Sequence, residues 1–274
     1  MRLVVAGRIP RIKRKSLAGQ FVLVLIGLQM MFFTSFVAVE LPTGTGQNML
    51  NSGRHTLATA ARLMPKQWSE KLKTTHPDWF HETKPIRTMV YTPLAPMAIF
   101  LGYILGKPIG PISVFLFLVL GFLGPIFGIN PFASGGGLDY YMQPSFGYLL
   151  GLIAGSSFVG WITEERRTSF AQVVALLGGL TSVHLIGLAY LLGSCLVLTI
   201  VQGVNNGPLW LPWVFEEARN LSWYPLPYDA LFSIILIGMG FPFRYLVNLL
   251  TAPDLALKSR GDRVVQQQME ELLN

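Results

Sequence analysis

The chain has 274 residues, of which 51% are hydrophobic and only 13% carry a charged side chain. Soluble domains contain roughly twice that share of charged residues, so the composition excludes an ordinary soluble protein and indicates an integral membrane protein. The net charge of +7 does not indicate nucleic-acid binding, because many of the cations gather directly beside an apolar segment.

Residues 1–15 form a basic N-terminal segment. Its cations precede a long uncharged stretch, and flanking cations of this kind hold a helix end on the cytoplasmic side. The apolar stretch exceeds the roughly 7–15 residues of a signal-peptide core, so we expect a retained first helix. With six helices, both termini would then be cytoplasmic. The cations are Arg2, Arg8, Arg11, Lys13, Arg14 and Lys15.

Six apolar segments within residues 16–250 have about the length that a bilayer core requires. In lipid such segments must be helical, because an isolated strand leaves its backbone polar groups unsatisfied. The sequence therefore predicts an all-α integral membrane protein with six transmembrane helices. The segments are 16–39, 88–105, 109–127, 146–162, 170–202 and 230–250.

A polar insertion, residues 40–87, separates the first two segments. Leu57, Ala61, Met64 and Trp68 recur in it at helical spacing, and Pro65 is expected to kink or divide the helix. The pattern is typical of an amphipathic element at the membrane surface. It is interpreted either as an interfacial connector or as a lid or partner contact.

The remaining connections differ in length between the two sides of the membrane. Loops 128–145 and 204–228 are long and rich in Gly, Pro and aromatic residues, whereas 106–110 and 163–169 are short. Function is expected on the side with the elaborate loops. Residues 251–274 are polar and amphipathic, and we expect a cytoplasmic tail helix there.

Two ionisable residues lie close to or within predicted helices. Asp229 follows Pro227 and Tyr228 and precedes an apolar run, which suits either a helix N-cap or a ligand-binding carboxylate. His184 lies inside the fifth segment and is interpreted as an interhelical hydrogen-bonding group. With no second His or Cys at ligand spacing, the sequence predicts no metal site and no cofactor.

The sequence also allows the hypothesis that the protein is an enzyme. Ser156 and Ser157, with His184 on the next helix, could imitate an intramembrane serine hydrolase, but the second glycine that opens the nucleophile turn is missing. The chain also contains no P-loop and no HExxH motif. We therefore predict no catalytic residues, and any energy for transport must come from another subunit.

Five motifs stand out between residues 106 and 191. They are 106–110 (GKPIG), 124–127 (GPIF), 136–138 (GGL), 144–148 (PSFGY) and 184–191 (HLIGLAYL). Together they resemble the BioY family, the biotin-binding S components of energy-coupling-factor transporters. The similarity covers roughly residues 90–250, although Phe232 stands where that family has a lysine.

The resemblance implies an S-component-like six-helix bundle that transports biotin across the inner membrane of a bacterium. It would act with a transmembrane coupling subunit and ATPase subunits. An S component for another vitamin, or a non-transport membrane protein, is the alternative. The resemblance also implies a binding chamber beneath the outer loops, with aromatic walls, hydrogen-bonding groups and closely approaching glycine backbone. The expected residues are Asn130, Gly136, Gly137, Tyr140, Gln143, Ser145, Gly147, Tyr148, Trp223, Tyr228 and Asp229.

Overall fold

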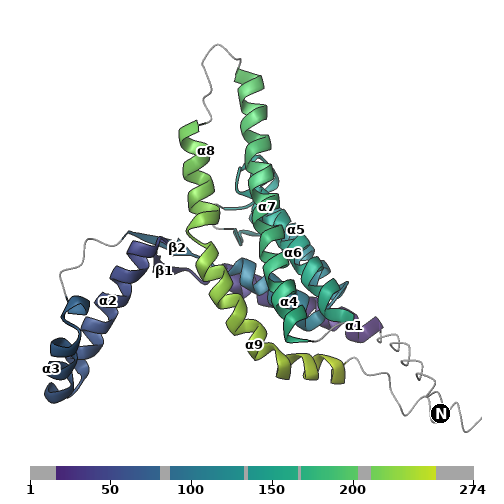
Figure 1. Cartoon of the computed structure of the whole chain (residues 1–274). Coiled ribbons are helices and arrows are strands. Elements are labelled where there is room, and N and C mark those ends of the chain that lie inside the picture. Colours follow the sequence, from purple (N-terminus) through teal and green to yellow (C-terminus); the bar gives the residue numbers. More distant parts are fainter. Residues whose placement is uncertain (1–16, 81–86, 133–134, 166–167, 203–210, 251–274) are drawn as a thin grey trace, which may run out of the picture.

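The computed structural model describes residues 17–80, 87–132, 135–165, 168–202 and 211–250 (Figure 1). The predicted N-terminal segment 1–15 and the tail 251–274 lie outside the described residues. The regular elements are α1 (Leu17–Ser35), β1 (Val39–Pro42), α2 (Gly46–Leu63), α3 (Lys66–Thr75), β2 (Thr88–Tyr91), α4 (Leu94–Leu105), α5 (Ile109–Leu123), α6 (Phe146–Glu165), α7 (Ser169–Gln202), α8 (Leu211–Ala218) and α9 (Leu226–Leu250).

A helix occupies each of the six predicted apolar segments. Among the described residues, α1, α6, α7 and the stretch Ile109–Phe127, which contains α5, are long and apolar enough to cross a membrane. The shorter apolar helix α4 and the 25-residue helix α9 occupy the other two segments. The predicted all-α, multi-pass membrane architecture is confirmed.

The boundaries of the first two predicted segments were wrong at the ends that face one another. Helix α1 ends at Ser35 rather than at residue 39, and α4 begins at Leu94 rather than at residue 88. The intervening residues form an antiparallel ribbon, in which Val39 pairs with Tyr91 and Pro42 pairs with Thr88. Val, Thr and Tyr fit a pleated ladder better than a helix. The two strands therefore bring together both ends of the insertion.

The insertion itself projects from this ribbon as two helices (Figure 1). Helix α2 ends at Leu63 and α3 begins at Lys66. The break falls at Pro65, as predicted, because proline cannot donate the backbone hydrogen bond that a continuous helix needs. We call α2 and α3 together the arm.

Helix α4 lies at the centre of the bundle. Ten of its twelve residues are buried, and Ala98, Ile99 and Leu101 have no exposed surface. It packs against α1, α5, α6, α7 and α9. This surrounded position explains why a short helix is sufficient here, since α4 has little surface left for lipid.

The most extensive helix pair among the described residues is α6 with α7, and a strip of glycines spaced four residues apart forms its interface. Gly147 lies against Tyr190, Gly151 against Val183 and Gly155 against Gly179. A Cβ atom added at Gly151 would lie 2.5 Å from the carbonyl oxygen of Val183. Small residues thus let two membrane helices approach backbone to backbone.

Helix α9 changes direction along its length (Figure 1), and Pro242 lies inside it. A proline within a helix removes one backbone hydrogen bond and bends the helix. Beyond the bend, a guanidinium N–H of Arg244 donates to the carbonyl oxygen of Thr163 at 2.9 Å. The same guanidinium lies 5.1 Å from the centre of the Tyr103 ring, so the bent end of α9 is attached to α4 and α6.

Candidate functional site

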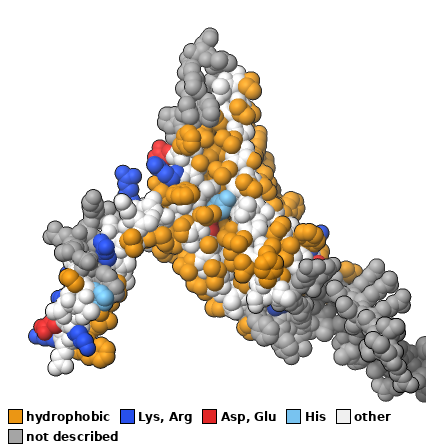
Figure 2. All heavy atoms as spheres, viewed as in Figure 1, with side chains coloured by type: hydrophobic (Ala, Val, Ile, Leu, Met, Phe, Trp, Pro, Cys, Tyr) orange, Lys and Arg blue, Asp and Glu red, His pale blue; other side chains and the backbone are white. Residues whose placement is uncertain are grey.

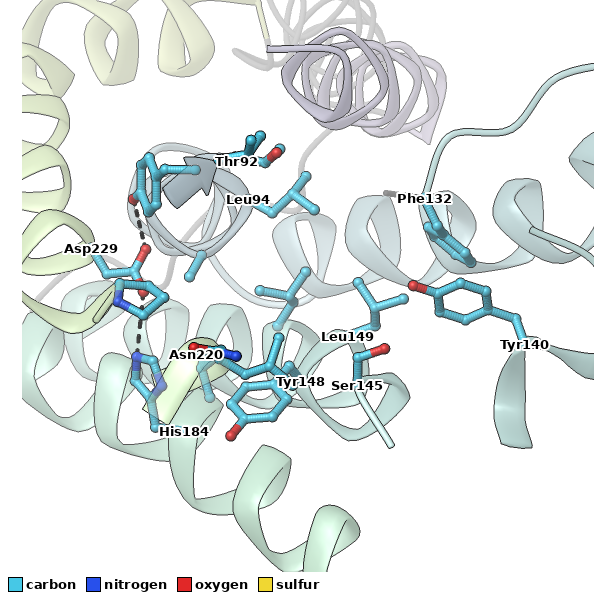
Figure 3. Close-up of a pocket in the computed structure, with 17 residues that line it drawn as sticks. Thr92, Leu94, Phe132, Tyr140, Ser145, Tyr148, Leu149, His184, Asn220 and Asp229 are labelled. Carbon is cyan, nitrogen blue, oxygen red and sulfur yellow. Dashed lines mark hydrogen bonds and ion pairs between the residues drawn. The ribbon is translucent and has the colours of Figure 1, made fainter. Parts of the chain in front are cut away.

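A cavity of about 230 Å³ lies where β2 and the start of α4 meet α6, α7 and the start of α9. Figure 3 shows Phe132 and Tyr140 at one end of it, and Asp229 and His184 at the other. Aliphatic side chains, among them Leu149 and Leu152, cover the space between them. The cavity therefore has an apolar body and one polar end.

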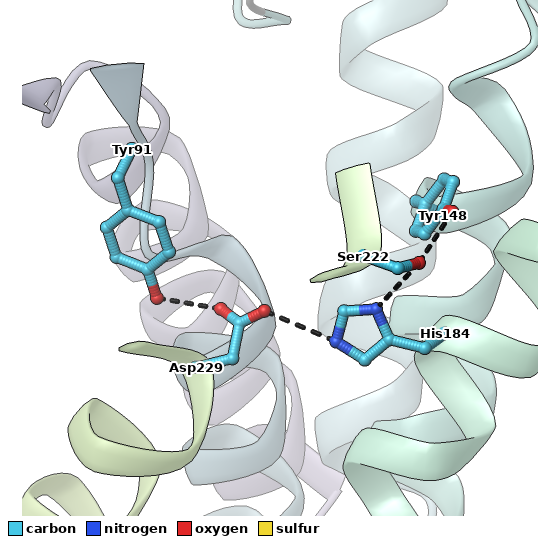
Figure 4. Close-up of polar contacts among 5 residues, drawn as sticks. All are labelled: Tyr91, Tyr148, His184, Ser222 and Asp229. Atoms are coloured by element: carbon cyan, nitrogen blue, oxygen red, sulfur yellow. Dashed lines mark hydrogen bonds and ion pairs between the residues drawn. The ribbon is translucent and has the colours of Figure 1, made fainter. Parts of the chain in front are cut away.

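The polar end is a chain of five hydrogen-bonding side chains drawn from β2, α6, α7, α9 and the π-helical turn Arg219–Trp223 (Figure 4). The hydroxyl of Tyr91 donates to Asp229 Oδ1 at 2.7 Å. The Nδ1 atom of His184 lies 3.3 Å from Ser222 Oγ, and Tyr148 Oη lies 2.7 Å from that same oxygen. The chain thus couples the ribbon to three membrane helices.

His184 and Asp229 meet at the middle of this chain. The distance from His184 Nε2 to Asp229 Oδ2 is 3.4 Å, within ion-pair range, although the two atoms are not aligned as a hydrogen bond. Both residues are buried, with exposed fractions of 7% and 4%. The predicted interhelical role of His184 agrees with this geometry, because it joins α7 to α9.

The N-cap interpretation of Asp229 is wrong. Helix α9 already begins at Leu226, and the backbone N–H of Asp229 donates to the carbonyl oxygen of Pro225 at 2.8 Å. An N-cap residue lies before the first helical residue, whereas Asp229 lies within the first turn. Its carboxylate instead points into the bundle, where it meets Tyr91 and His184.

Tyr91 is a hydrogen-bond donor to this carboxylate. Burial raises the pKa of the Tyr91 hydroxyl above its ordinary value, and the charge of Asp229 and the hydrogen bond to it raise the pKa further. A raised pKa keeps the phenol protonated at any physiological pH. Tyr91 therefore holds Asp229 in place as a neutral donor.

Replacing Tyr91 by Phe removes this donor and leaves the buried carboxylate less well solvated. A hydrogen bond to a charged group contributes about 1.5–3 kcal/mol, so the thermal unfolding midpoint of the detergent-solubilised protein should fall. The matched control is Tyr141→Phe, at a ring that is 49% exposed. Equal midpoints for the two variants would show that the Tyr91–Asp229 bond adds nothing to stability.

The predicted site residues separate into two groups. Tyr140, Ser145, Tyr148 and Asp229 line the cavity together. The other seven do not line it: Asn130, Gly136, Gly137, Gln143, Gly147, Trp223 and Tyr228.

The residues outside the cavity have other contacts. Gly137 donates its backbone N–H to the carbonyl oxygen of Gly121 at 3.1 Å, attaching the loop to α5, and Tyr228 donates to the carbonyl oxygen of Pro42 at 2.7 Å. Asn130 and Gln143 are exposed. Trp223 is 65% exposed and lines a second, largely apolar cavity of about 560 Å³ on the other side of His184 and Ser222.

The sequence interpretation missed Tyr91 and Asn220, which line the cavity, and Ser222, which contacts His184 and Tyr148 behind it. Tyr91 was assigned to a helix, so its position in a strand beside Asp229 could not be foreseen. Ser222 and Asn220 lie in the turn before α9. In and just after this turn, the sequence predicted only the aromatic residues Trp223 and Tyr228, with Asp229, as site residues. The sequence signal that could have identified these residues is the Pro-rich connection that leads directly to Asp229.

Ser222, His184 and Asp229 have the order of a hydrolase triad, but their geometry favours a binding network. The Ser–His and His–Asp distances of 3.3 and 3.4 Å exceed the roughly 2.6–3.2 Å expected of a nucleophile and its base. Ser222 is also engaged by Tyr148. Of the two serines suggested by the sequence, Ser156 and Ser157, Ser157 donates to the carbonyl oxygen of Ile153 at 2.7 Å. Within the described residues, no group of three or more His, Cys, Asp or Glu side chains is placed to hold a metal ion.

Comparison with known proteins adds a family match. A family model described as the BioY family matches residues 85–240. The "Probable biotin transporter BioY" of Lysinibacillus sphaericus is 30% identical over 92 residues, which are 33% of this chain and 45% of that protein. The "Biotin transporter BioY" of Thermotoga maritima is 30% identical over 106 residues, covering 38% and 57% of the two chains.

The chain thus spans about half the length of the curated relatives that it matches. Among solved structures, it is similar to the S component for biotin from an ECF-type ABC transporter. That match has a TM-score of 0.47 and 15% identity, and it covers 84% of this chain and 90% of the other.

Proposed function

We propose, because this chain belongs to the BioY family, that it binds biotin and carries it across the membrane as the S component of a transporter. The matched relatives are named biotin transporters, and the proposal extends that role to this chain. Separate coupling and ATPase subunits would supply the energy, since the sequence contains no P-loop. We assign the chain no enzymatic activity.

The observation that carries the proposal is the buried Asp229 carboxylate at the end of an apolar cavity. Biotin combines an apolar bicyclic body with a ureido group that offers two N–H donors and one carbonyl acceptor. A carboxylate accepts only, so Asp229 would take the ureido N–H groups. His184, which lines the cavity, would donate to the ureido carbonyl, and the aliphatic walls would cover the bicyclic body.

The other end of the ligand would lie near Ser145 and Tyr140, at the far end of the cavity (Figure 3). Phe232 takes no part, because its ring stacks on Tyr91 with centroids 5.6 Å apart and does not line the cavity. Its role would be to hold Tyr91 against Asp229 through packing. The valeryl carboxylate of biotin would then rely on hydroxyl groups and backbone N–H groups rather than on a lysine.

The cavity is smaller than the roughly 300–1,000 Å³ of typical ligand sites, at about 230 Å³. Ligand entry would therefore displace a covering element. Two candidates cover the polar end: the ribbon, through Val90 and Tyr91, and the turn before α9, through Asn220 and Leu221. Both lie outside the membrane-spanning helices, where movement disturbs the least packing.

The cavity would open to the outside of the cell, with both termini in the cytoplasm of a bacterium and the chain in its inner membrane. The basic residues before α1 support this orientation. It places the ribbon and the turn before α9 on the outer face, where an imported vitamin arrives.

Equilibrium binding to the purified, detergent-solubilised chain tests the proposal. We expect saturable biotin binding with a dissociation constant below micromolar by isothermal titration calorimetry, together with a rise in the thermal unfolding midpoint. Thiamine, riboflavin and pantothenate serve as the comparison panel. If one of these stabilises the protein and biotin does not, the substrate assignment is wrong although the site stands. If none binds, the transport proposal fails.

A further inference from the structure

The arm has an apolar stripe whose large side chains are exposed. Leu50, Leu57 and Met64 lie seven residues apart, which puts them on one face of α2 and its C-cap. Their exposed fractions are 65%, 39% and 43%, and Trp68 of α3 is 72% exposed. Ala61 lies on the same face, between Leu57 and Met64, and is buried. We call Leu50, Leu57, Met64 and Trp68 the arm stripe.

The arm is also strongly basic. Helices α2 and α3 contain five Lys or Arg residues and a single acid, Glu70. Figure 2 shows hydrophobic side chains along one edge of the arm and blue cationic groups beside them. An apolar face bordered by cations is the pattern of helices that lie in the headgroup region of a membrane. The five are Arg54, Arg62, Lys66, Lys71 and Lys73.

The base of the arm holds it close to the membrane boundary. Strand β1 begins four residues after the end of α1, so the arm leaves the bundle at the level where that apolar helix ends. The base is fixed to the bundle, because Tyr228 of α9 donates to the carbonyl oxygen of Pro42 at 2.7 Å and Gly44 packs against Pro227. A lipid leaflet is therefore the surface that the arm meets first.

We propose that the arm docks on the adjacent leaflet, inserting the arm stripe among the acyl chains while its cations bind anionic phospholipid headgroups. The charge complementarity selects an anionic leaflet: each Lys or Arg near such a surface strengthens binding by about fivefold. The stripe contributes an apolar term that does not depend on lipid charge. The proposal is independent of which ligand the cavity binds.

Fluorescence quenching on the full chain in lipid nanodiscs tests this docking. An environment-sensitive fluorophore is attached through Leu57→Cys, in the stripe, or through Thr59→Cys, on the opposite face of the same helix. The native Cys195 is buried, and the unsubstituted chain provides the labelling blank. Each protein is placed in phosphatidylcholine alone and in phosphatidylcholine mixed with phosphatidylglycerol.

The label at position 57 should be quenched several-fold more by spin-labelled lipid in the anionic nanodiscs than in the neutral ones. The label at position 59 should stay accessible to aqueous acrylamide in both. Replacing Lys66, Lys71 and Lys73 by Gln should remove most of the dependence on phosphatidylglycerol, and high salt should do the same.

Three outcomes would overturn the proposal. The label at position 57 could remain equally accessible to acrylamide in both lipid mixtures. The label could also become less accessible to acrylamide in detergent as the protein concentration rises, which would show that a second copy of the chain covers the stripe. It could also be protected only after addition of an acidic soluble polypeptide. Thermal melts of the Gln variant control for misfolding. A melting midpoint equal to that of the unsubstituted chain shows that any change in lipid dependence comes from the lost charges.

Discussion

Replacing Asp229 by Asn is expected to weaken biotin binding by roughly 10- to 150-fold, because a hydrogen bond to a charged group contributes about 1.5–3 kcal/mol. The side chain keeps its size and can still accept from Tyr91, which lies 2.7 Å from Oδ1. What it loses is the negative charge and the second acceptor that faces the ligand. Calorimetric titration of the purified variant with biotin measures the change.

The matched control is Asp139→Asn, which removes an exposed acid from the loop before α6 without touching the cavity. It should leave biotin affinity unchanged, within a factor of two. A variant at Asp229 that melts at a lower temperature but binds biotin as tightly as the native chain would make the carboxylate structural. The ligand-binding role would then have to be given up.

Replacing Gly151 by Ala is expected to lower stability by about 1–3 kcal/mol, the usual range for an overpacked core. The new Cβ would lie 2.5 Å from the Val183 carbonyl oxygen and 2.9 Å from its Cα. Backbone atoms cannot rotate away, so α6 and α7 must separate. Since these helices carry Tyr148 and His184, biotin affinity should fall as well. Thermal unfolding and calorimetry measure the two effects.

Gly193→Ala in α7 is the control, because a Cβ there meets nothing within 4 Å. Alanine favours a helix over glycine by up to about 1 kcal/mol, so this variant should melt at the same temperature or slightly higher. If Gly151→Ala melts like Gly193→Ala, the two helices do not pack as closely as the structure has them.

The six membrane segments were predictable because the bilayer fixes both their length and their hydrophobicity. The ribbon was not predictable in the same way. Val39 and Tyr91 pair across about fifty residues, and each strand is only four residues long beside an apolar helix. An apolar run of that length has no period of its own to separate strand from helix.

The site was predicted in its location but only partly in its residues. Neighbouring residues on a helix point in directions about 100° apart, so a motif identifies a turn without saying which side chain faces inward. Tyr148 lines the cavity while Gly147 faces Tyr190. Asp229 lines it while Tyr228 reaches back to Pro42.

The turn before α9 shows the same limit. There the small Ser222 points into the bundle, and Trp223, predicted as a cavity wall, points outward. Aromatic residues dominated the sequence signal at this turn. Packing against His184 and Tyr148 determines the orientation instead, and both lie on helices distant in the chain.

An experimental structure of the chain with biotin bound is the most direct measurement of the central claim. The account predicts density for biotin between Asp229 and Tyr148, with the ureido nitrogens within hydrogen-bond distance of the Asp229 carboxylate. Biotin bound instead against Trp223, in the second cavity, or with its ureido group turned away from Asp229, would contradict it.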